Sequence, residues 1–194
     1  MISAKVGHSL DPLILKFYRL FFGRHIINPN ILTVCGALLS IGVCFAVAWG
    51  HLILGGVVLL ASGFLDLMDG ALARSSDQVT PFGGFLDSVL DRYSDLLVMC
   101  GILVYFMKRD DSLLTIVAFV AAIGVAIIPY AKARAEAASL TCNTGLLERP
   151  ERVVILLIGL LCNLLSYAVF ALAVLTHVTV VQRILYVRRQ IHRT

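Results

Sequence analysis

Long apolar stretches separated by short polar turns dominate the chain from residue 30 onward. An α-helix needs roughly 20 apolar residues to cross the hydrocarbon core of a bilayer, and several stretches have about that length. The first begins near Asn30, directly after Pro29, a residue that favours the first position of a helix. The pattern predicts five more spanning helices, at about residues 52–74, 84–107, 113–138, 152–165 and 167–187.

A mixed segment precedes these stretches. Residues 9–24 combine Leu, Ile, Phe and Tyr with Lys16, Arg19 and Arg24, a composition typical of a helix that lies in the membrane interface. The whole pattern predicts an all-α integral membrane fold in one domain over residues 1–194. An N-terminal interfacial amphipathic helix (9–24) would lead into a bundle of six transmembrane helices (30–187).

Composition supports the membrane interpretation and excludes two other classes. The chain is 59% hydrophobic with a mean hydropathy of +0.92, which is far too apolar for a soluble domain. The net charge of +4 comes without a soluble basic domain or interleaved aromatic and basic residues, so a nucleic-acid partner is excluded. The five cysteines show no C-x-x-C spacing and predict neither a disulfide framework nor a zinc site.

The distribution of Lys and Arg predicts the orientation, because cytoplasmic loops carry an excess of positive charge. One set of turns has only Lys108 and Arg109, which Asp110 and Asp111 offset. Both termini and the ends of the second and third helices are therefore expected to face the cytoplasm. The basic residues on that side are Lys5, Lys16, Arg19, Arg24, Arg74, Lys132, Arg134, Arg149, Arg152, Arg183, Arg188, Arg189 and Arg193.

Four aspartates stand out in these apolar helices. Asp66 and Asp69 are three residues apart, and Asp87 and Asp91 are four apart, so each pair lies on one helix face. A charged carboxylate at membrane depth costs about 2.5–3.5 kcal/mol, so such a cluster is expected to have a function. Carboxylates are the ligands that Mg²⁺ and Mn²⁺ prefer, and four can hold the two ions of a two-metal phosphoryl-transfer site.

The neighbouring residues fit a phosphate ligand. Gly70 has no Cβ and lets a ligand approach the helix backbone, and Arg74 lies where it could bind a phosphate through two hydrogen bonds. Two alternatives are structural ion pairs with Arg74 and Arg92, and a cation pathway. Asp95, four residues after Asp91, is expected to pair with Arg92 or a water chain and not to bind metal.

The motif D-x-x-D-G-x-x-A-R at residues 66–74, followed by G-x-x-x-D-x-x-x-D at 83–91, resembles the signature of the CDP-alcohol phosphotransferases, also called the CDP-alcohol phosphatidyltransferase family. This resemblance implies a membrane enzyme of phospholipid biosynthesis, and a homodimer. The hydroxyl of an acceptor alcohol would attack the β-phosphorus of a CDP-linked lipid and release CMP. It implies that Asp66, Asp69, Asp87 and Asp91 bind the metal and that Asp91 is also the general base.

The resemblance further implies contacts to the donor, which would be CDP-diacylglycerol or an ether-lipid analogue. The positions that match donor-binding positions of the family are Pro29, Asn30, Ile31, Leu32, Gly70, Arg74 and Thr80.

A basic segment bears on the acceptor. The stretches K-x-R-x-E at residues 132–136 and E-R-x-x-R at 148–152 resemble the phosphatidylinositol phosphate synthase branch of the family. In that branch Lys132, Arg149 and Arg152 would bind the acceptor phosphate, with Arg183 as the candidate for a further contact. The alternative is that these cations anchor the loop or pair with Glu136, Glu148 and Glu151.

The sequence thus leads to a CDP-alcohol phosphatidyltransferase that acts on a phosphorylated alcohol, with inositol phosphate as the expected acceptor. A phosphatidylglycerophosphate synthase using glycerol 3-phosphate is the closest alternative, because the same cations would bind its phosphate. A divalent-cation transporter would use the aspartates without any lipid substrate. A non-catalytic membrane scaffold would not need the aspartate spacing.

Overall fold

The computed structural model describes Ile14, Lys16, Tyr18 and residues 28–75, 79–142 and 144–191. The predicted all-α class is confirmed for this part of the chain, and the expected boundaries agree with the observed ones within a few residues. The helices from residue 29 onward are α2 (Pro29–Ala48), α3 (Leu52–Ser75), α4 (Pro81–Met107), α5 (Ser112–Ala137), α6 (Arg149–Leu161) and α7 (Leu165–Ile191).

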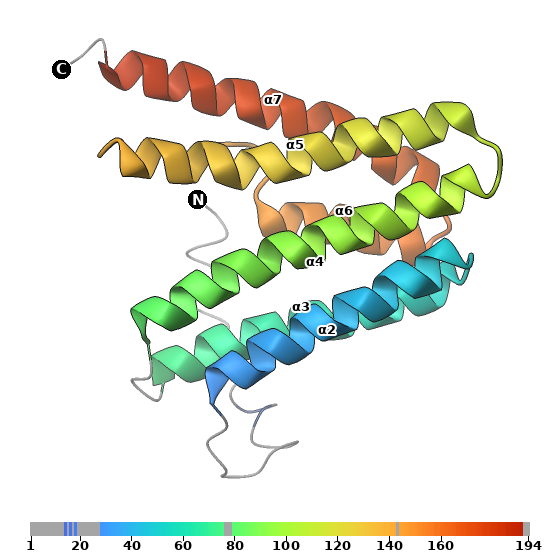
Figure 1. The fold of residues 1–194 in the computed structure, drawn as a ribbon, viewed down its shortest axis with the longest axis horizontal. Coiled ribbons are helices and arrows are strands. Elements are labelled where there is room, and N and C mark those ends of the chain that lie inside the picture. The colour runs from blue at the N-terminus through green and yellow to red at the C-terminus, as the bar shows by residue number, and fades with distance from the viewer. Residues whose placement is uncertain are drawn as a thin grey trace.

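The helices form two groups, and contacts made by α4 and α6 join one group to the other (Figure 1). Helices α2, α3 and α4 pack together on one side, and α5 and α7 lie side by side on the other. Helix α4 contacts α5, while the short α6 packs against both α3 and α7. The apolar core therefore runs through both groups, and its most buried members include Val43, Ile102, Leu160, Val169 and Leu172.

Four helices of the described chain, α2, α3, α5 and α7, are long and apolar enough to cross a membrane. Helix α4 is as long as α7, but it carries Asp87, Asp91, Arg92 and Asp95. Helix α6 has 13 residues, which corresponds to about 20 Å at the rise of an α-helix. The chain is a multi-pass membrane protein with four helices of spanning length among the described residues, and the six complete spans stay a prediction.

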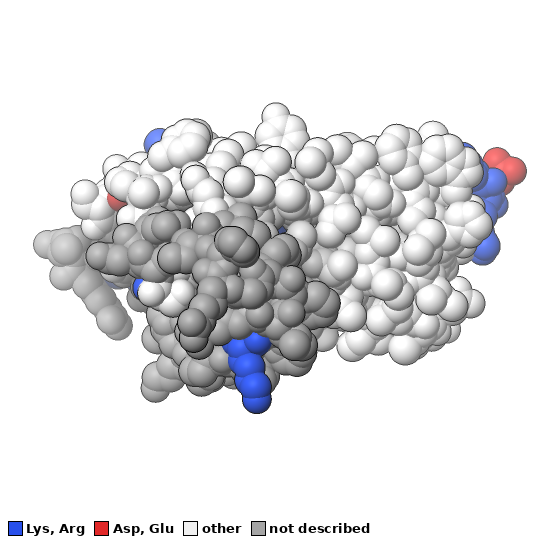
Figure 2. All heavy atoms as spheres, turned by 90° about the horizontal axis from the view of Figure 1, so that it is seen from below, with Lys and Arg blue, Asp and Glu red and all other residues white. Residues whose placement is uncertain are grey.

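The surface agrees with lipid contact. Seen from below, the part between the grey residues and the end where α4 turns into α5 shows no charged side chain, and Lys, Arg, Asp and Glu side chains lie at that end (Figure 2). The last turn of α3, the first turn of α4 and the C-terminal ends of α5 and α7 lie at the opposite end (Figure 1). The aspartate motif and the basic segments therefore share one end of the bundle.

Most of the predicted interfacial helix at residues 9–24 lies outside the described residues. Of this segment Ile14, Lys16 and Tyr18 are described, and all three are helical. Ile14 and Tyr18 are buried in a cluster with Leu32, Met68, Ala71 and Leu72, whereas Lys16 is exposed.

Helices α5 and α7 approach closely at Gly124. A Cβ there would lie 2.0 Å from Thr176 Oγ1 and 3.0 Å from His177 Nδ1, and Thr176 is fully buried. We expect Gly124→Ala to force the helices apart, to cost about 1–3 kcal/mol and to lower the thermal unfolding midpoint in detergent by about 5 °C. The matched control is Gly42→Ala in α2, where the nearest atom would lie 3.7 Å away. Equal midpoints for the two variants would contradict the close approach.

Candidate active site

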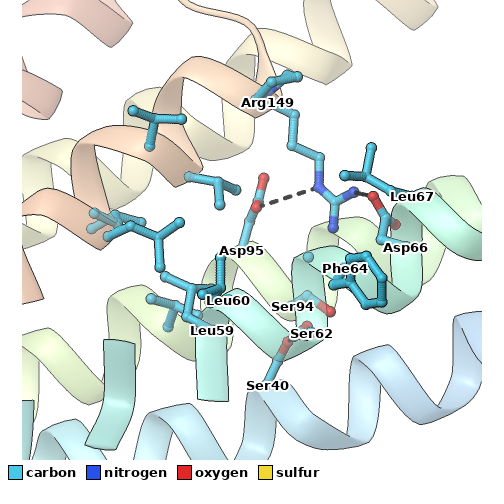
Figure 3. A pocket seen from close by; sticks show the side chains of 17 residues that line it. Ser40, Leu59, Leu60, Ser62, Phe64, Asp66, Leu67, Ser94, Asp95 and Arg149 are labelled. Atoms are coloured by element: carbon cyan, nitrogen blue, oxygen red, sulfur yellow. Dashed lines mark hydrogen bonds and ion pairs between the residues drawn. The ribbon is translucent and has the colours of Figure 1, made fainter. Parts of the chain in front are cut away.

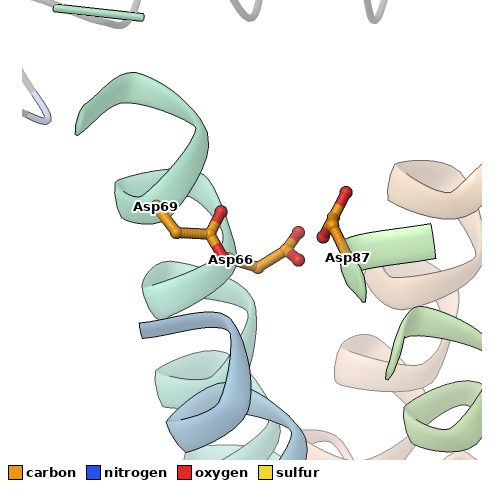
Figure 4. Close-up of side chains that lie close together, drawn as sticks. All are labelled: Asp66, Asp69 and Asp87. Atoms are coloured by element: carbon orange, nitrogen blue, oxygen red, sulfur yellow. The ribbon is translucent and has the colours of Figure 1, made fainter. Parts of the chain in front are cut away.

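Three of the predicted aspartates converge. Asp66 and Asp69 from α3 and Asp87 from α4 each place a carboxylate oxygen within 4.8 Å of the others (Figure 4). Asp69 is only 7% exposed, and its Oδ2 has no hydrogen-bond partner among the described residues. A buried carboxylate oxygen without a donor needs a cation, so the three carboxylates fit a divalent metal ion.

The capped N-termini of α2 and α4 lie close to this cluster. Thr80 caps α4, because its Oγ1 accepts a hydrogen bond from the backbone N–H of Gly83 at 3.0 Å, and Pro81 occupies the first helical turn. Asn28 caps α2 in the same way through the N–H of Asn30. These caps hold the first turns of α2 and α4 beside the last turns of α3.

The fourth aspartate, Asp91, is engaged by an arginine from α6. Arg149 Nη1 donates to Asp66 Oδ2 at 2.5 Å and lies 2.9 Å from Asp91 Oδ1. Asp91 also lies 3.5 Å from Arg92, and it is not among the three carboxylates that share the 4.8 Å cluster. The structure thus places Asp91 at the edge of the cluster, and its predicted role as a metal ligand stays a prediction.

Asp95 corrects one expectation. Its partner is not Arg92, which is 42% exposed and pairs with Asp91, but Arg152, whose Nη2 lies 2.6 Å from Asp95 Oδ2. Arg149 Nε lies 3.8 Å from the other oxygen of Asp95 (Figure 3). Asp91 and Asp95 share a face of α4 that is turned toward α6, and this explains why the arginines of α6 reach both.

A cavity of about 330 Å³ lies next to the aspartates, between the N-terminal ends of α2 and α4 and the C-terminal end of α3. Five of the seven predicted donor-binding residues line it: Pro29, Asn30, Gly70, Arg74 and Thr80. Ile31 and Leu32 do not, because neighbouring residues of a helix point in different directions. Ile31 is exposed, and Leu32 is buried in the apolar cluster. Thr33, one turn after Pro29, lines the cavity in their place.

Thr80 lines this cavity, and its side chain also caps the N-terminus of α4. We expect Thr80→Val to remove the cap at a cost of about 1 kcal/mol and to raise about fivefold the KM for the CDP-lipid that the sequence resemblance implies. Thr80→Ser keeps the hydroxyl and serves as the matched control, with a KM close to that of the wild type. Kinetics of CMP release measure both, and equal KM values for the two variants would show that the cap does not shape the site.

A second cavity, of about 280 Å³, extends from Asp66, Asp95 and Arg149 between α3, α4 and α6 (Figure 3). Its walls are mainly apolar. Ser40 and Ser62 face it and both reach the carbonyl of Gly36, with Ser62 donating at 2.9 Å. Sequence analysis missed these serines, although Ser62 stands one helical turn before Asp66 in an otherwise apolar run.

The predicted acceptor contacts divide into two groups. Arg149 and Arg152 reach the aspartates, whereas Lys132 is 43% exposed and pairs with Glu136 at 3.9 Å. Arg183 is buried and donates from Nε to Thr144 O at 3.0 Å and from Nη1 to Ile128 O at 2.5 Å. Its described hydrogen bonds therefore connect α7 to α5 and to the loop before α6.

The sequence and the fold are similar to those of known proteins. Residues 26–182 match the family model described as CDP-alcohol phosphatidyltransferase. An archaetidylinositol phosphate synthase of Pyrococcus horikoshii is 37% identical over 166 residues, which are 85% of this chain and 86% of that protein.

Two crystal structures of Mycobacterium tuberculosis phosphatidylinositol phosphate synthase are similar at 32% sequence identity. The one with CDP-DAG bound has a TM-score of 0.79 and covers 91% of this chain and 92% of its own. The other, in complex with manganese and citrate, has a TM-score of 0.78 and covers 91% of this chain and 87% of its own.

Proposed function

The chain belongs to the CDP-alcohol phosphatidyltransferase family, and on that premise we propose that it transfers the phosphatidyl-type group of a CDP-lipid to inositol phosphate and releases CMP. The observation that carries the acceptor class is the approach of Arg149 and Arg152 to the aspartates, because a phosphate entering a site lined with carboxylates needs cations of its own. Because the members of this family are enzymes, we no longer consider the divalent-cation transporter or the non-catalytic scaffold.

The donor would lie in the 330 Å³ cavity, with its diphosphate toward Asp69 and Asp87, which line the same space. Asp66, Asp69 and Asp87 would hold Mg²⁺ or Mn²⁺, with Asp91 as the proposed fourth ligand and a second ion as the family resemblance implies. A divalent ion bound there neutralises charge on the diphosphate. Arg74 would bind the same phosphates from one turn further along α3.

The proposed reaction needs one base. The hydroxyl of the acceptor attacks the β-phosphorus, its proton passes to the carboxylate of Asp91, and the bond to CMP breaks as the new phosphodiester forms. Asp91 is suited to this role because it lies at the edge of the cluster, between the other aspartates and the arginines of α6. Arg149 and Arg152 would hold the acceptor phosphate, and Lys132 would attract it from the exposed end of α5.

The proposed topology follows from the shared end of the bundle. The aspartates, the basic loop and the end of α7 lie together, so we place this end and both termini in the cytoplasm and propose that α4 and α6 complete a six-helix membrane bundle. The carboxylates of α4 would lie near the membrane surface, where water reaches them. The family resemblance favours a homodimer.

The test is CMP release by purified protein with CDP-diacylglycerol and either Mg²⁺ or Mn²⁺, with inositol phosphate, glycerol 3-phosphate, free inositol and serine offered in turn. We expect inositol phosphate to give the largest kcat/KM. A preference for glycerol 3-phosphate would identify the alternative synthase, in which the same arginines bind the phosphate. A preference for serine or free inositol would contradict the proposed role of Arg149 and Arg152.

A further inference from the structure

Asp95 connects the two arginines of α6. Arg152 lies against one of its oxygens at 2.6 Å, and Arg149 Nε lies 3.8 Å from the other. The side chain of Asp95 is 12% exposed and that of Arg152 is 5% exposed. Buried guanidinium groups need a counter-charge, so this carboxylate stabilises both.

Arg149 contacts three carboxylates, and two of them have a proposed role in the reaction. Asp66 and Asp91, its other partners, are the carboxylates that the proposed function assigns to the metal and to the proton. Among the ion pairs of the described residues, Asp95 is the contact of Arg149 that has neither role. If Asp66 binds the metal and Asp91 accepts the proton, Asp95 remains as the carboxylate that holds Arg149 beside the site.

The arginines also keep donors available. The Nε atoms of Arg149 and Arg152 are buried, and neither makes a hydrogen bond with any described residue. Buried donors without partners are costly, which indicates that a ligand satisfies them. Both arginines stand at the first turn of α6, next to the 280 Å³ cavity that Asp66, Asp95 and Arg149 line.

We propose that Asp95 is a positioning residue for the acceptor: it holds Arg149 and Arg152 as a pair, and the N–H groups that Asp95 does not engage bind the acceptor phosphate. This inference rests on the proposed function and deepens it. Asp95 belongs neither to the three-carboxylate cluster nor to the lining of the donor cavity. Its effect on metal and donor binding can pass only through Arg149, so we expect that effect to be much smaller than the effect on the acceptor.

The test is Asp95→Asn, which keeps the shape and removes the charge. We expect the KM for inositol phosphate to rise about 10- to 100-fold, because charge-assisted hydrogen bonds lose their alignment. The KM for CDP-diacylglycerol and the Mn²⁺ affinity, measured by titration calorimetry without lipid, should stay within about twofold of the wild type. Asp95→Glu should recover part of the acceptor KM because it restores the charge.

A triple variant separates positioning from packing. If Asp95 acts through the two arginines, then adding Asp95→Asn to the double variant Arg149→Gln, Arg152→Gln should raise the acceptor KM no further than that double variant does. A lower unfolding midpoint with an unchanged acceptor KM would overturn the proposal, as would loss of Mn²⁺ binding in Asp95→Asn. If Asp95→Asn does not fold, Arg152→Lys, which keeps the charge but lacks the planar fork, carries the same comparison of acceptor KM with Mn²⁺ affinity.

A failure of the Asp95 inference can be distinguished from a failure of the proposed acceptor. If the wild type prefers glycerol 3-phosphate, the acceptor assignment fails, but the Asp95 effect is measured on the KM for glycerol 3-phosphate and the inference stands or falls there. If the wild type uses an acceptor without a phosphate, both are overturned.

Discussion

Asp91→Asn is expected to reduce the turnover of CMP release by about a thousandfold or more. General-base catalysis contributes about 10²- to 10⁴-fold, and an amide cannot take the proton of the attacking hydroxyl. The substitution also removes a charge that lies 2.9 Å from Arg149, which would then keep Asp66 as its nearest carboxylate. Single-turnover measurements with saturating CDP-diacylglycerol and Mn²⁺ would report the chemical step directly.

Two further variants interpret this result. Asp69→Asn should lose Mn²⁺ binding as well as turnover, because Asp69 belongs to the three-carboxylate cluster and its Oδ2 lacks a described partner. Asp110→Asn makes the same chemical change at the far end of the bundle, where φ is 54° and Asn is well tolerated. It should keep full turnover. Asp91→Asn with wild-type turnover would exclude Asp91 as the base.

The helices and the metal cluster were predictable because they depend on local patterns. Apolar length placed six helices, and the spacing of Asp66, Asp69 and Asp87 brought three carboxylates onto two facing surfaces. The cavity beside the aspartates, which we propose holds the donor, was predictable to the extent that residues of the motif line it. The donor contacts of Ile31 and Leu32 stay predictions. The two residues lie outside the lining of this cavity because only every third or fourth residue of a helix faces a given cavity.

The contacts of α6 were not predictable in the same way. Arg149 is 83 residues from Asp66 and Arg152 is 57 from Asp95, and helix periodicity carries no information on which helices pack together. The expectation that Asp95 pairs with Arg92 used the nearest opposite charge in the sequence. In the fold Arg92 points outward and α6 supplies the partners.

Arg149→Gln is expected to change metal and acceptor binding in opposite directions. Arg149 Nη1 lies against Asp66 and Asp91, so it competes with a cation for these carboxylates and repels it. Without the guanidinium the Mn²⁺ affinity should rise about tenfold, which corresponds to about 1.4 kcal/mol. The KM for inositol phosphate should rise about 100-fold, because the proposed charge-assisted contact of Arg149 to the acceptor phosphate would be lost.

Arg149→Lys separates charge from geometry. Lysine keeps the positive charge but lacks the planar fork, so the Mn²⁺ affinity should stay near that of the wild type while the acceptor KM still rises. Lys132→Gln should raise the acceptor KM less than Arg149→Gln, because Lys132 is half-exposed and already pairs with Glu136. Weaker Mn²⁺ binding in Arg149→Gln would show that the arginine supports the metal site. Its closeness to Asp66 and Asp91 would then reflect preorganisation of the carboxylates and not competition.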